Sequence, residues 1–222
     1  MSRPSRSRLA TLVGLLPYAR VLADIGAGDL DLARLALARG RAARVIAVDR
    51  APGACARARL RARTDARIEV REGDGFSPLK AGEAEVAVLA GLGGKTLARI
   101  LERAALGVPA ALPPTLVLAP NQDLWLALAA LARSGYTLRR WALVAEGARL
   151  RPLLHAVRPP QGGGGEAAEG GELMRTRLVS GEALRAAFLS ERAQVLGREL
   201  EGADGERADA LRCWLEEVEG AL

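Results

Sequence analysis

The chain has 222 residues, of which 50% are hydrophobic and 26% are charged, and its formal net charge is +6. This apolar content excludes a wholly disordered chain, and no apolar run reaches the roughly 18 residues that a transmembrane helix needs. With only two cysteines and one histidine, the sequence lacks the residues for a disulfide scaffold or a zinc-type site, so we expect no metal.

The N-terminal region combines arginines with a short apolar run, a pattern that imitates a signal peptide. Arg3, Arg6 and Arg8 precede the sequence LATLVGLL, which ends at Pro17. Cleavage near Ala23 would remove the start of the first predicted strand. We therefore predict no signal peptide and a cytoplasmic protein, and unpaired thiols are consistent with a reducing compartment.

Over the first 158 residues, apolar runs alternate with helical patterns. Five buried strands are expected, in chain order RVLADIG, RVIAVD, RIEVREGD, EVAVLAG and TLVLAP. Helices are expected after the first, second, fourth and fifth of them, at residues 29–40, 52–63, 95–103 and 124–133. YTLRRWALVAEG and LRPLLHAV are expected to form a final antiparallel pair. This alternation predicts an α/β fold with a mostly parallel sheet and helices on both faces.

A change of composition separates this body from the C-terminal region. The sequence PPQGGGGEAAEGGE at residues 159–172 is typical of a flexible linker. We therefore predict a domain at 1–158, a linker at 159–172 and a small α-helical, coiled-coil-like hairpin at 173–222. Two roles for this hairpin stay open: it packs on the body or on a second copy of the chain, or it binds the substrate. For the oligomeric state we favour a monomer.

Glycines and acidic residues follow the predicted strands, at the edge where parallel sheets bind ligands. The glycines and acids are Asp24, Gly26 and Gly28 at the end of the first strand, Asp49 at the second, Asp74 and Gly75 at the third, and Gly91 at the fourth. Ala90 and Asn121 are the other candidates, at the ends of the fourth and fifth strands. Asp31 stands where a dinucleotide fingerprint needs its third glycine, and no phosphate loop is present.

A pocket for a nucleoside without a pyrophosphate therefore fits these residues better. Asp49 can hold both ribose hydroxyls and Asp74 can accept from an adenine amino group, while Asp24 orders the first glycine loop beside a cationic group. This set describes S-adenosylmethionine. The simpler alternative is that the glycines serve tight turns and that Asp49 and Asn121 cap helices.

Several motifs together resemble one family, the bacterial tRNA (adenine-22-N1)-methyltransferases, or TrmK family. They are ADIG, GDG, AGLGG, ILE in the next helix, LAPN, a Trp in the helix after it, and Arg8–Leu9 near the start. The resemblance covers roughly residues 8–158, and the tail is similar in layout. It implies a Rossmann-like class I methyltransferase that uses S-adenosylmethionine and modifies tRNA.

By position, the resemblance implies a cofactor site lined by Arg8, Asp24, Gly26, Asp49, Asp74 and the Ala90–Gly91 loop. It also implies that Asn121 and the stretch 91–94 face the target base. The chain departs from the family pattern at three places: Gly28–Asp29 replaces Asp-His, Arg151–Pro152 replaces Tyr-Glu, and Ala119 replaces Gln.

Methylation at N1 of adenine needs alignment and stabilisation of positive charge rather than a strong base. The catalytic candidates are Asp29, as a carboxylate near the base, and Asn121, as a hydrogen-bonding group at the base edge. Two alternatives stay open: a methyltransferase of another RNA base or a small molecule, and a degenerate homologue that binds RNA or a protein. The arginines at 57, 59, 61 and 63 form either a tRNA footprint or a solvated helix face.

Overall fold

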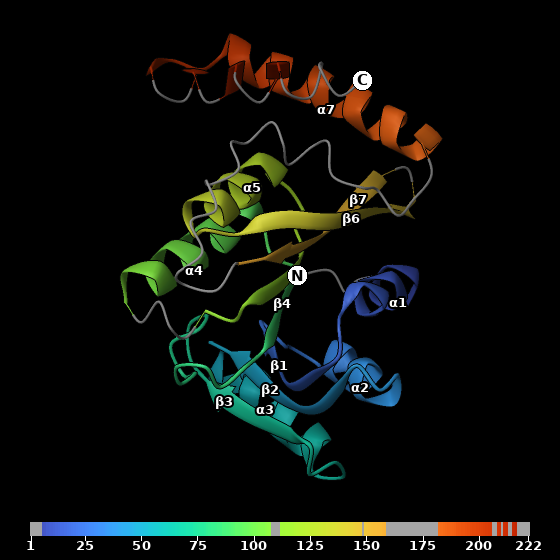
Figure 1. Cartoon of the computed structure of the whole chain (residues 1–222), viewed down its shortest axis with the longest axis vertical. Coiled ribbons are helices and arrows are strands. Elements are labelled where there is room, and N and C mark those ends of the chain that lie inside the picture. Colours follow the sequence, from blue (N-terminus) through green and yellow to red (C-terminus); the bar gives the residue numbers. More distant parts are fainter. Residues whose placement is uncertain are drawn as a thin grey trace.

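The computed structural model describes residues 6–107, 112–147, 149–158, 182–205, 208–209, 211–212 and 215–216. These described residues contain the following seven strands and six helices (Figure 1). In chain order they are α1 (Arg6–Leu15), β1 (Ala19–Ile25), α2 (Asp31–Ala38), β2 (Ala42–Asp49), α3 (Pro52–Ala62), β3 (Ile68–Glu72), β4 (Val86–Ala90), α4 (Gly94–Leu106), β5 (Thr115–Ala119), α5 (Leu124–Arg133), β6 (Thr137–Glu146), β7 (Arg149–Val157) and α7 (Glu182–Glu201).

The strands form one sheet in the order β3-β2-β1-β4-β5-β7-β6. The first five strands pair in parallel, and β7 pairs antiparallel with both β5 and β6. The predicted parallel sheet and final antiparallel pair are therefore confirmed. Strand order reverses between β1 and β4, so the carboxyl ends of these strands form the switch point where open α/β sheets bind ligands.

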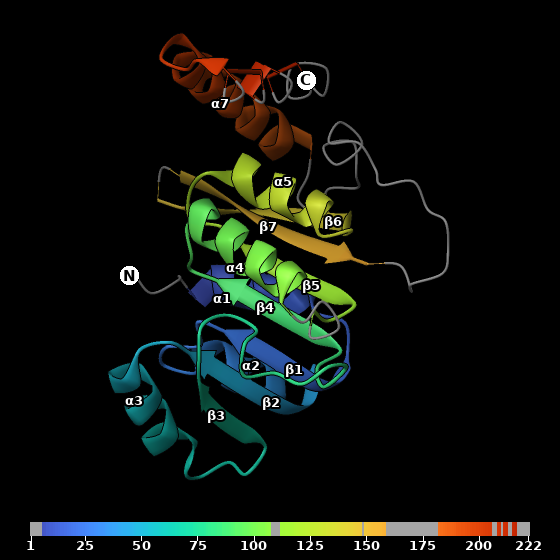
Figure 2. The same cartoon turned by 90° about the vertical axis from the view of Figure 1, so that its left-hand side faces the viewer.

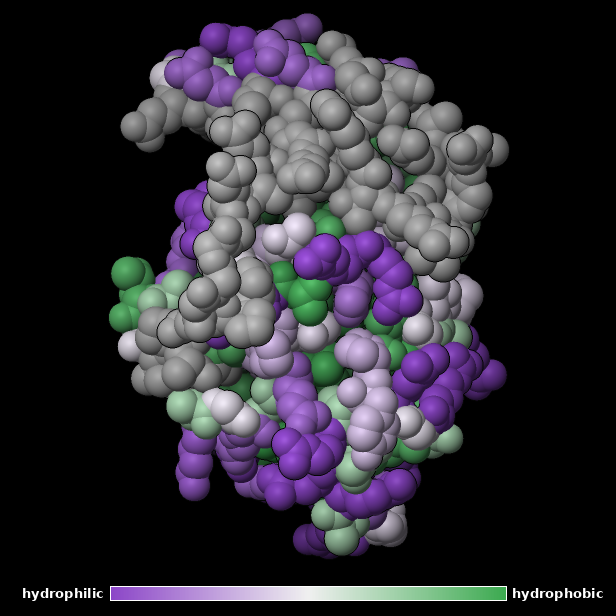
Figure 3. Space-filling model, viewed as in Figure 1, coloured by the Kyte–Doolittle hydropathy of each residue, from purple (hydrophilic) through white to green (hydrophobic). Residues whose placement is uncertain are grey.

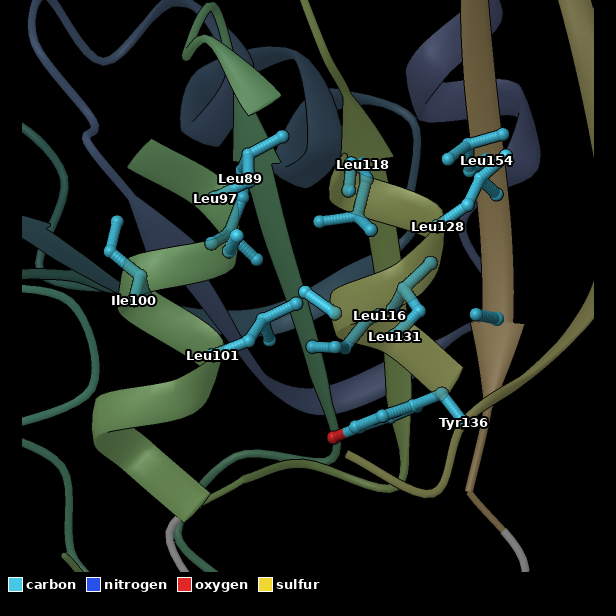
Figure 4. Packing of buried hydrophobic residues seen from close by; sticks show 14 of the residues in the cluster. Leu89, Leu97, Ile100, Leu101, Leu116, Leu118, Leu128, Leu131, Tyr136 and Leu154 are labelled. Carbon is cyan, nitrogen blue, oxygen red and sulfur yellow. The ribbon is translucent and has the colours of Figure 1, made fainter. Parts of the chain in front are cut away.

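Two apolar layers cover the two faces of the sheet (Figure 2). On one face, α1, α2 and α3 contribute side chains such as Leu12, Ala33 and Ala58. On the other face, leucines of α4 and α5 pack against Leu89 of β4 and Leu116 of β5 (Figure 4). The α/β architecture follows from strands that are apolar on both faces, because each face must be covered by helices.

The N-terminal apolar run forms a helix that the sequence pattern did not predict. Helix α1 buries Leu12, Val13 and Leu15 in the same layer as α2. A second difference is at β3, which ends at Glu72 rather than continuing to Asp74. The chain turns there because Gly75 adopts a left-handed backbone with φ of +63°, a conformation that disfavours other residues.

The C-terminal helix α7 packs against β6, the strand at one edge of the sheet. The rings of Phe188 in α7 and Trp141 in β6 lie 5.7 Å apart, and Leu189, Leu196 and Leu211 are buried in the same cluster. The described residues between 205 and 216 are also helical, as the predicted hairpin requires. The linker expected at 159–172 lies outside the described residues, so the domain boundaries stay predictions.

Hydrophilic and apolar side chains share the one face of the described residues that Figure 3 shows. Figure 3 shows one face, on which purple side chains dominate and apolar atoms are visible between them near the middle of the molecule. Among the residues that the structure describes, the large exposed hydrophobic ones are Leu106, Leu60 and Tyr18, with 88%, 61% and 63% of their surface accessible. In the part of the chain that the structure describes, no helix is long and apolar enough to cross a membrane.

Candidate functional site

The first glycine loop turns the chain from β1 into α2. Gly26 and Gly28 adopt φ values of +81° and +52°, and Leu30 adopts a φ of 65°. The amides of Gly26 and Ala27 both donate to the carbonyl oxygen of Val48, at 2.8 and 3.0 Å. The loop is therefore tied to the end of the neighbouring strand β2, where the next acidic residue follows.

Asp49 is the last residue of β2, and backbone amides hold its carboxylate in place. Its Oδ2 accepts from the amide of Gly28 at 3.2 Å, and its Oδ1 accepts from the amide of Ala51 at 2.9 Å. Two carboxylate oxygens offer about four acceptor positions. Two positions therefore remain for a ligand after the backbone has been satisfied.

A cavity of about 230 Å³ lies at this edge of the sheet. Five residues that the sequence predicted as cofactor-binding line it: Gly26, Asp49, Asp74, Gly75 and Gly91. A side chain at Gly91 would meet no heavy atom within 4 Å, and its φ is +75°. The glycine therefore leaves open space for a ligand.

Two arginines of α4 hold Asp74, the acid after β3. Its Oδ2 accepts from Arg103 at 2.7 Å, and its Oδ1 lies 3.9 Å from Arg99. Arg99 and Arg50 also line the cavity. Sequence reasoning missed these three arginines, although the four-residue spacing of Arg99 and Arg103 places both on one helix face and was a usable signal.

Asp24 lies in β1 with only 3% of its surface exposed. Burial raises the pKa of its carboxyl group to about 7, and the negative charge of Asp49 acts in the same direction. A hydrogen bond with the backbone of Ala33 acts against them. The buried Oδ2 atom of Asp24 has no hydrogen-bond partner within the described structure. A buried acceptor without a hydrogen bond lowers the stability of the folded protein. Its presence here is therefore better explained by a functional role than by folding.

Arg8 and Asn121 belong to a hydrogen-bonded network beside the cavity. Arg8 is 3% exposed, and its guanidinium donates to Oδ1 of Asn121 and to the carbonyl oxygen of Ala119, both at 2.8 Å. Nδ2 of Asn121 donates to the carbonyl oxygen of Gly91 at 2.8 Å. Arg8 itself is not among the residues that line the 230 Å³ cavity, and its bond to Asn121 connects it to Gly91, which does line that cavity.

The remaining predicted residues lie around this site. Ala90 ends β4 and directly precedes Gly91. Asp29 follows the first glycine loop, and its Oδ1 lies 3.9 Å from Arg61 of α3, which also donates to Asp31 at 3.2 Å. Asp29 is not among the residues that line the cavity. No group of three or more potential metal ligands occurs among the described residues.

The start of α4 depends on a glycine. An ideal Cβ at Gly94 would lie 2.0 Å from the carbonyl oxygen of Asp123, and the Gly94 amide donates to the carbonyl oxygen of Gln122 at 2.9 Å. We expect Gly94→Ala to destabilise the protein by about 3 kcal/mol, because backbone must move to admit the methyl group. Urea unfolding measures this.

Gly14→Ala is the matched control for Gly94→Ala. Gly14 lies inside α1, and its Cβ would meet nothing within 4 Å. Alanine there should stabilise the helix by up to about 1 kcal/mol. Equal stability of the two variants would contradict the close approach of α4 and α5 described above.

Comparisons with known proteins place this geometry in a family. A family model described as "Methyltransferase domain" matches residues 5–154. The tRNA (adenine(22)-N(1))-methyltransferase of Bacillus subtilis (strain 168) is 35% identical over 98 residues, which are 43% of this chain and 41% of that protein. The match thus spans less than half the length of this curated relative.

Solved structures share this fold, as two of them show. The crystal structure of the B. subtilis m1A22 tRNA methyltransferase TrmK superposes with a TM-score of 0.74 at 24% identity, covering 99% of this chain and 98% of that one. The structure of M. capricolum TrmK in complex with S-adenosyl-homocysteine gives a TM-score of 0.73 at 14% identity, covering 99% of this chain and 97% of that one. These likenesses establish a Rossmann-like methyltransferase fold. Because the family model covers residues 5–154, the chain belongs to the methyltransferase domain family.

Proposed function

We propose that the chain is an S-adenosylmethionine-dependent methyltransferase whose methyl acceptor is N1 of adenine 22 in tRNA. The observation that carries the proposal is the cavity at the switch point of the sheet, lined by Asp49, Asp74 and three glycines from different loops. The B. subtilis relative, 35% identical over 98 residues, is named for this activity.

The residues around the cavity fit the cofactor. Asp49 keeps two acceptor positions that suit the two ribose hydroxyls, and Asp74 offers an acceptor for an adenine amino group. Gly26 and Gly91 allow close approach of the ligand to the backbone. The unpartnered Oδ2 of Asp24 lies behind the first glycine loop and favours a cationic group there. When bound, S-adenosylmethionine supplies an electrophilic methyl group on a sulfonium.

On the acceptor side, the protein must orient the base and stabilise developing positive charge. Asn121 is the first candidate, because its Oδ1 and Nδ2 atoms each make one bond in the network and each retains one further position. Asp29 is the second, as a carboxylate that is 38% exposed at the end of the first glycine loop. The target base must first leave its stack, which costs a few kcal/mol.

The distribution of charge favours contacts of the body, rather than the tail, with tRNA. Arg57, Arg59 and Arg63 are exposed on or at the end of α3. Residues 161–222 contain 7 Lys and Arg against 13 Asp and Glu, a net charge of −6 that repels phosphate. We therefore propose a footprint on the body and binding that weakens steeply with salt, by a monomeric cytoplasmic protein.

The test combines purified protein, labelled S-adenosylmethionine and unmodified tRNA transcripts, followed by mass spectrometry of the nucleosides. We expect 1-methyladenosine, and we expect it to disappear when adenine 22 of the transcript is replaced by guanine. A different methylated nucleoside would assign another RNA base to the site. Absence of any product, with cofactor binding verified separately, would contradict catalysis on tRNA and favour a binding role.

A further inference from the structure

One carboxylate lies between two arginines next to the candidate site. Glu146 is the last residue of β6, and its Oε2 lies 3.4 Å from Nη1 of Arg8 and 3.4 Å from Nε of Arg151. All three side chains are largely buried, at 3% exposure for Arg8 and 19% for the other two. Two guanidinium groups this close repel each other at low local dielectric, and Glu146 offsets that repulsion.

Both arginines donate hydrogen bonds to the segment at the end of β5 and directly after it. Arg8 donates to the carbonyl oxygen of Ala119 at 2.8 Å and to Oδ1 of Asn121 at 2.8 Å. Arg151 donates to the carbonyl oxygen of Asn121 at 2.5 Å. The side chain and the main chain of Asn121 are therefore held from two directions, by α1 and by β7.

Asn121 in turn holds the loop that begins at Gly91, directly after β4. Its side-chain Nδ2 donates to the carbonyl oxygen of Gly91 at 2.8 Å. Its backbone N–H donates to the carbonyl oxygen of Leu92 at 2.9 Å. Gly91 and Leu92 line the 230 Å³ cavity. A continuous set of contacts thus connects Glu146, through the arginines and Asn121, to one wall of that cavity.

We propose that Glu146 is a positioning residue for methyl transfer, which keeps Asn121 and the Gly91 loop in the geometry that the reaction needs. The inference rests on the proposed function, since it assigns Asn121 to the acceptor side of the site. In this proposal Glu146 acts through Arg8 and Arg151, which contact it directly. The other walls of the cavity, around Gly26 and Asp49, are held by separate bonds.

The test uses the full chain with Glu146→Gln, which removes the charge and keeps the shape. We expect amide hydrogen exchange at residues 91–94 and 119–123 to become at least about tenfold faster, because local opening there becomes easier. Turnover on tRNA should fall at least about tenfold, while the Kd for S-adenosyl-homocysteine should change by less than about threefold.

Glu83→Gln is the matched control. Glu83 accepts two bonds from Arg71 at 2.7 Å, and the two side chains are 18% and 19% exposed, close to the values for Glu146 and Arg151. Loss of this pair should lower stability by a similar amount. It should leave exchange at 91–94 and 119–123 and the turnover unchanged.

A double-mutant cycle separates positioning from general loss of stability. If Glu146 acts by compensating the positive charge of Arg151, then the double variant Glu146→Gln/Arg151→Gln should turn over tRNA no more slowly than Glu146→Gln alone. Unchanged exchange in Glu146→Gln, equal effects in Glu83→Gln, or strictly additive losses in the cycle would each overturn the inference. If the wild type makes no product on tRNA, the proposed function fails, and the exchange data still decide whether Glu146 holds the loop.

Discussion

Replacement of Asp49 by asparagine is expected to raise the Kd for S-adenosyl-homocysteine by at least about 100-fold, measured by isothermal titration calorimetry. Asp49 accepts from the amides of Gly28 and Ala51 and, in the proposed complex, from two ribose hydroxyls. Asparagine has one acceptor oxygen, and its amide group would face at least one backbone donor. The loss of two charge-assisted hydrogen bonds, at about 1.5–3 kcal/mol each, corresponds to this factor.

Glu72→Gln is the control for charge. Glu72 ends β3 directly beside Asp49 in the sheet register, yet it does not line the cavity. The same change of charge there should alter the Kd by less than about threefold, because only a screened long-range effect is lost. If both variants bind S-adenosyl-homocysteine as the wild type does, the cavity is not the ribose site.

The predicted sheet and the cavity share one physical basis. Apolar runs that end at glycine or aspartate identify buried parallel strands, and such strands align their carboxyl ends. Asp49 and Gly26 are 23 positions apart in sequence, yet their strands pair directly, as Asp24 pairs with Ala47. The sequence pattern therefore predicted five residues that line the cavity, Gly26, Asp49, Asp74, Gly75 and Gly91, but it did not predict the arginines there, Arg50 and Arg99.

Contacts between distant elements were beyond the sequence pattern. Arg8 and Glu146 are 138 positions apart, and nothing in their local sequences indicates that α1 lies against the end of β6. Helix α1 was itself missed, because a short apolar run after arginines fits both a signal-like segment and a buried helix. Arg8 was expected to line the cofactor site, whereas its guanidinium group contacts Asn121, the carbonyl oxygens of Ala119 and Pro120, and Glu146.

Replacement of Asp24 by asparagine is expected to change the free energy of unfolding differently at two pH values. Relative to the wild type without ligand, the variant should be more stable at pH 8 than it is at pH 4. Burial raises the pKa of Asp24 from 3.8 to about 7. Between these values the folded protein holds a proton that the unfolded chain has released, so the free energy of unfolding decreases as pH rises. The total decrease is on the order of 4 kcal/mol by pH 8, since one pKa unit is worth about 1.4 kcal/mol.

The comparison of two pH values isolates the ionisation of Asp24. An asparagine amide buried at this position has its own hydrogen-bonding cost, but that cost is the same at pH 4 and pH 8. The stability difference between Asp24→Asn and the wild type should therefore be several kcal/mol more favourable at pH 8, as measured by urea unfolding at each pH. Asp31→Asn, which changes a half-buried acid paired with Arg61, should show a difference below about 1 kcal/mol.

A carboxyl group that costs stability in the free protein is consistent with a role in binding. A cationic ligand beside the first glycine loop would favour the ionised form of Asp24 and lower its pKa. Binding of S-adenosyl-homocysteine to the wild type at pH 7 should then release part of a proton, detected as a dependence of the calorimetric enthalpy on the buffer. The release should be absent in Asp24→Asn, whose affinity should also be lower. Equal proton release by both proteins would show that another group titrates, and Asp24 would then be a structural acid with no part in the site.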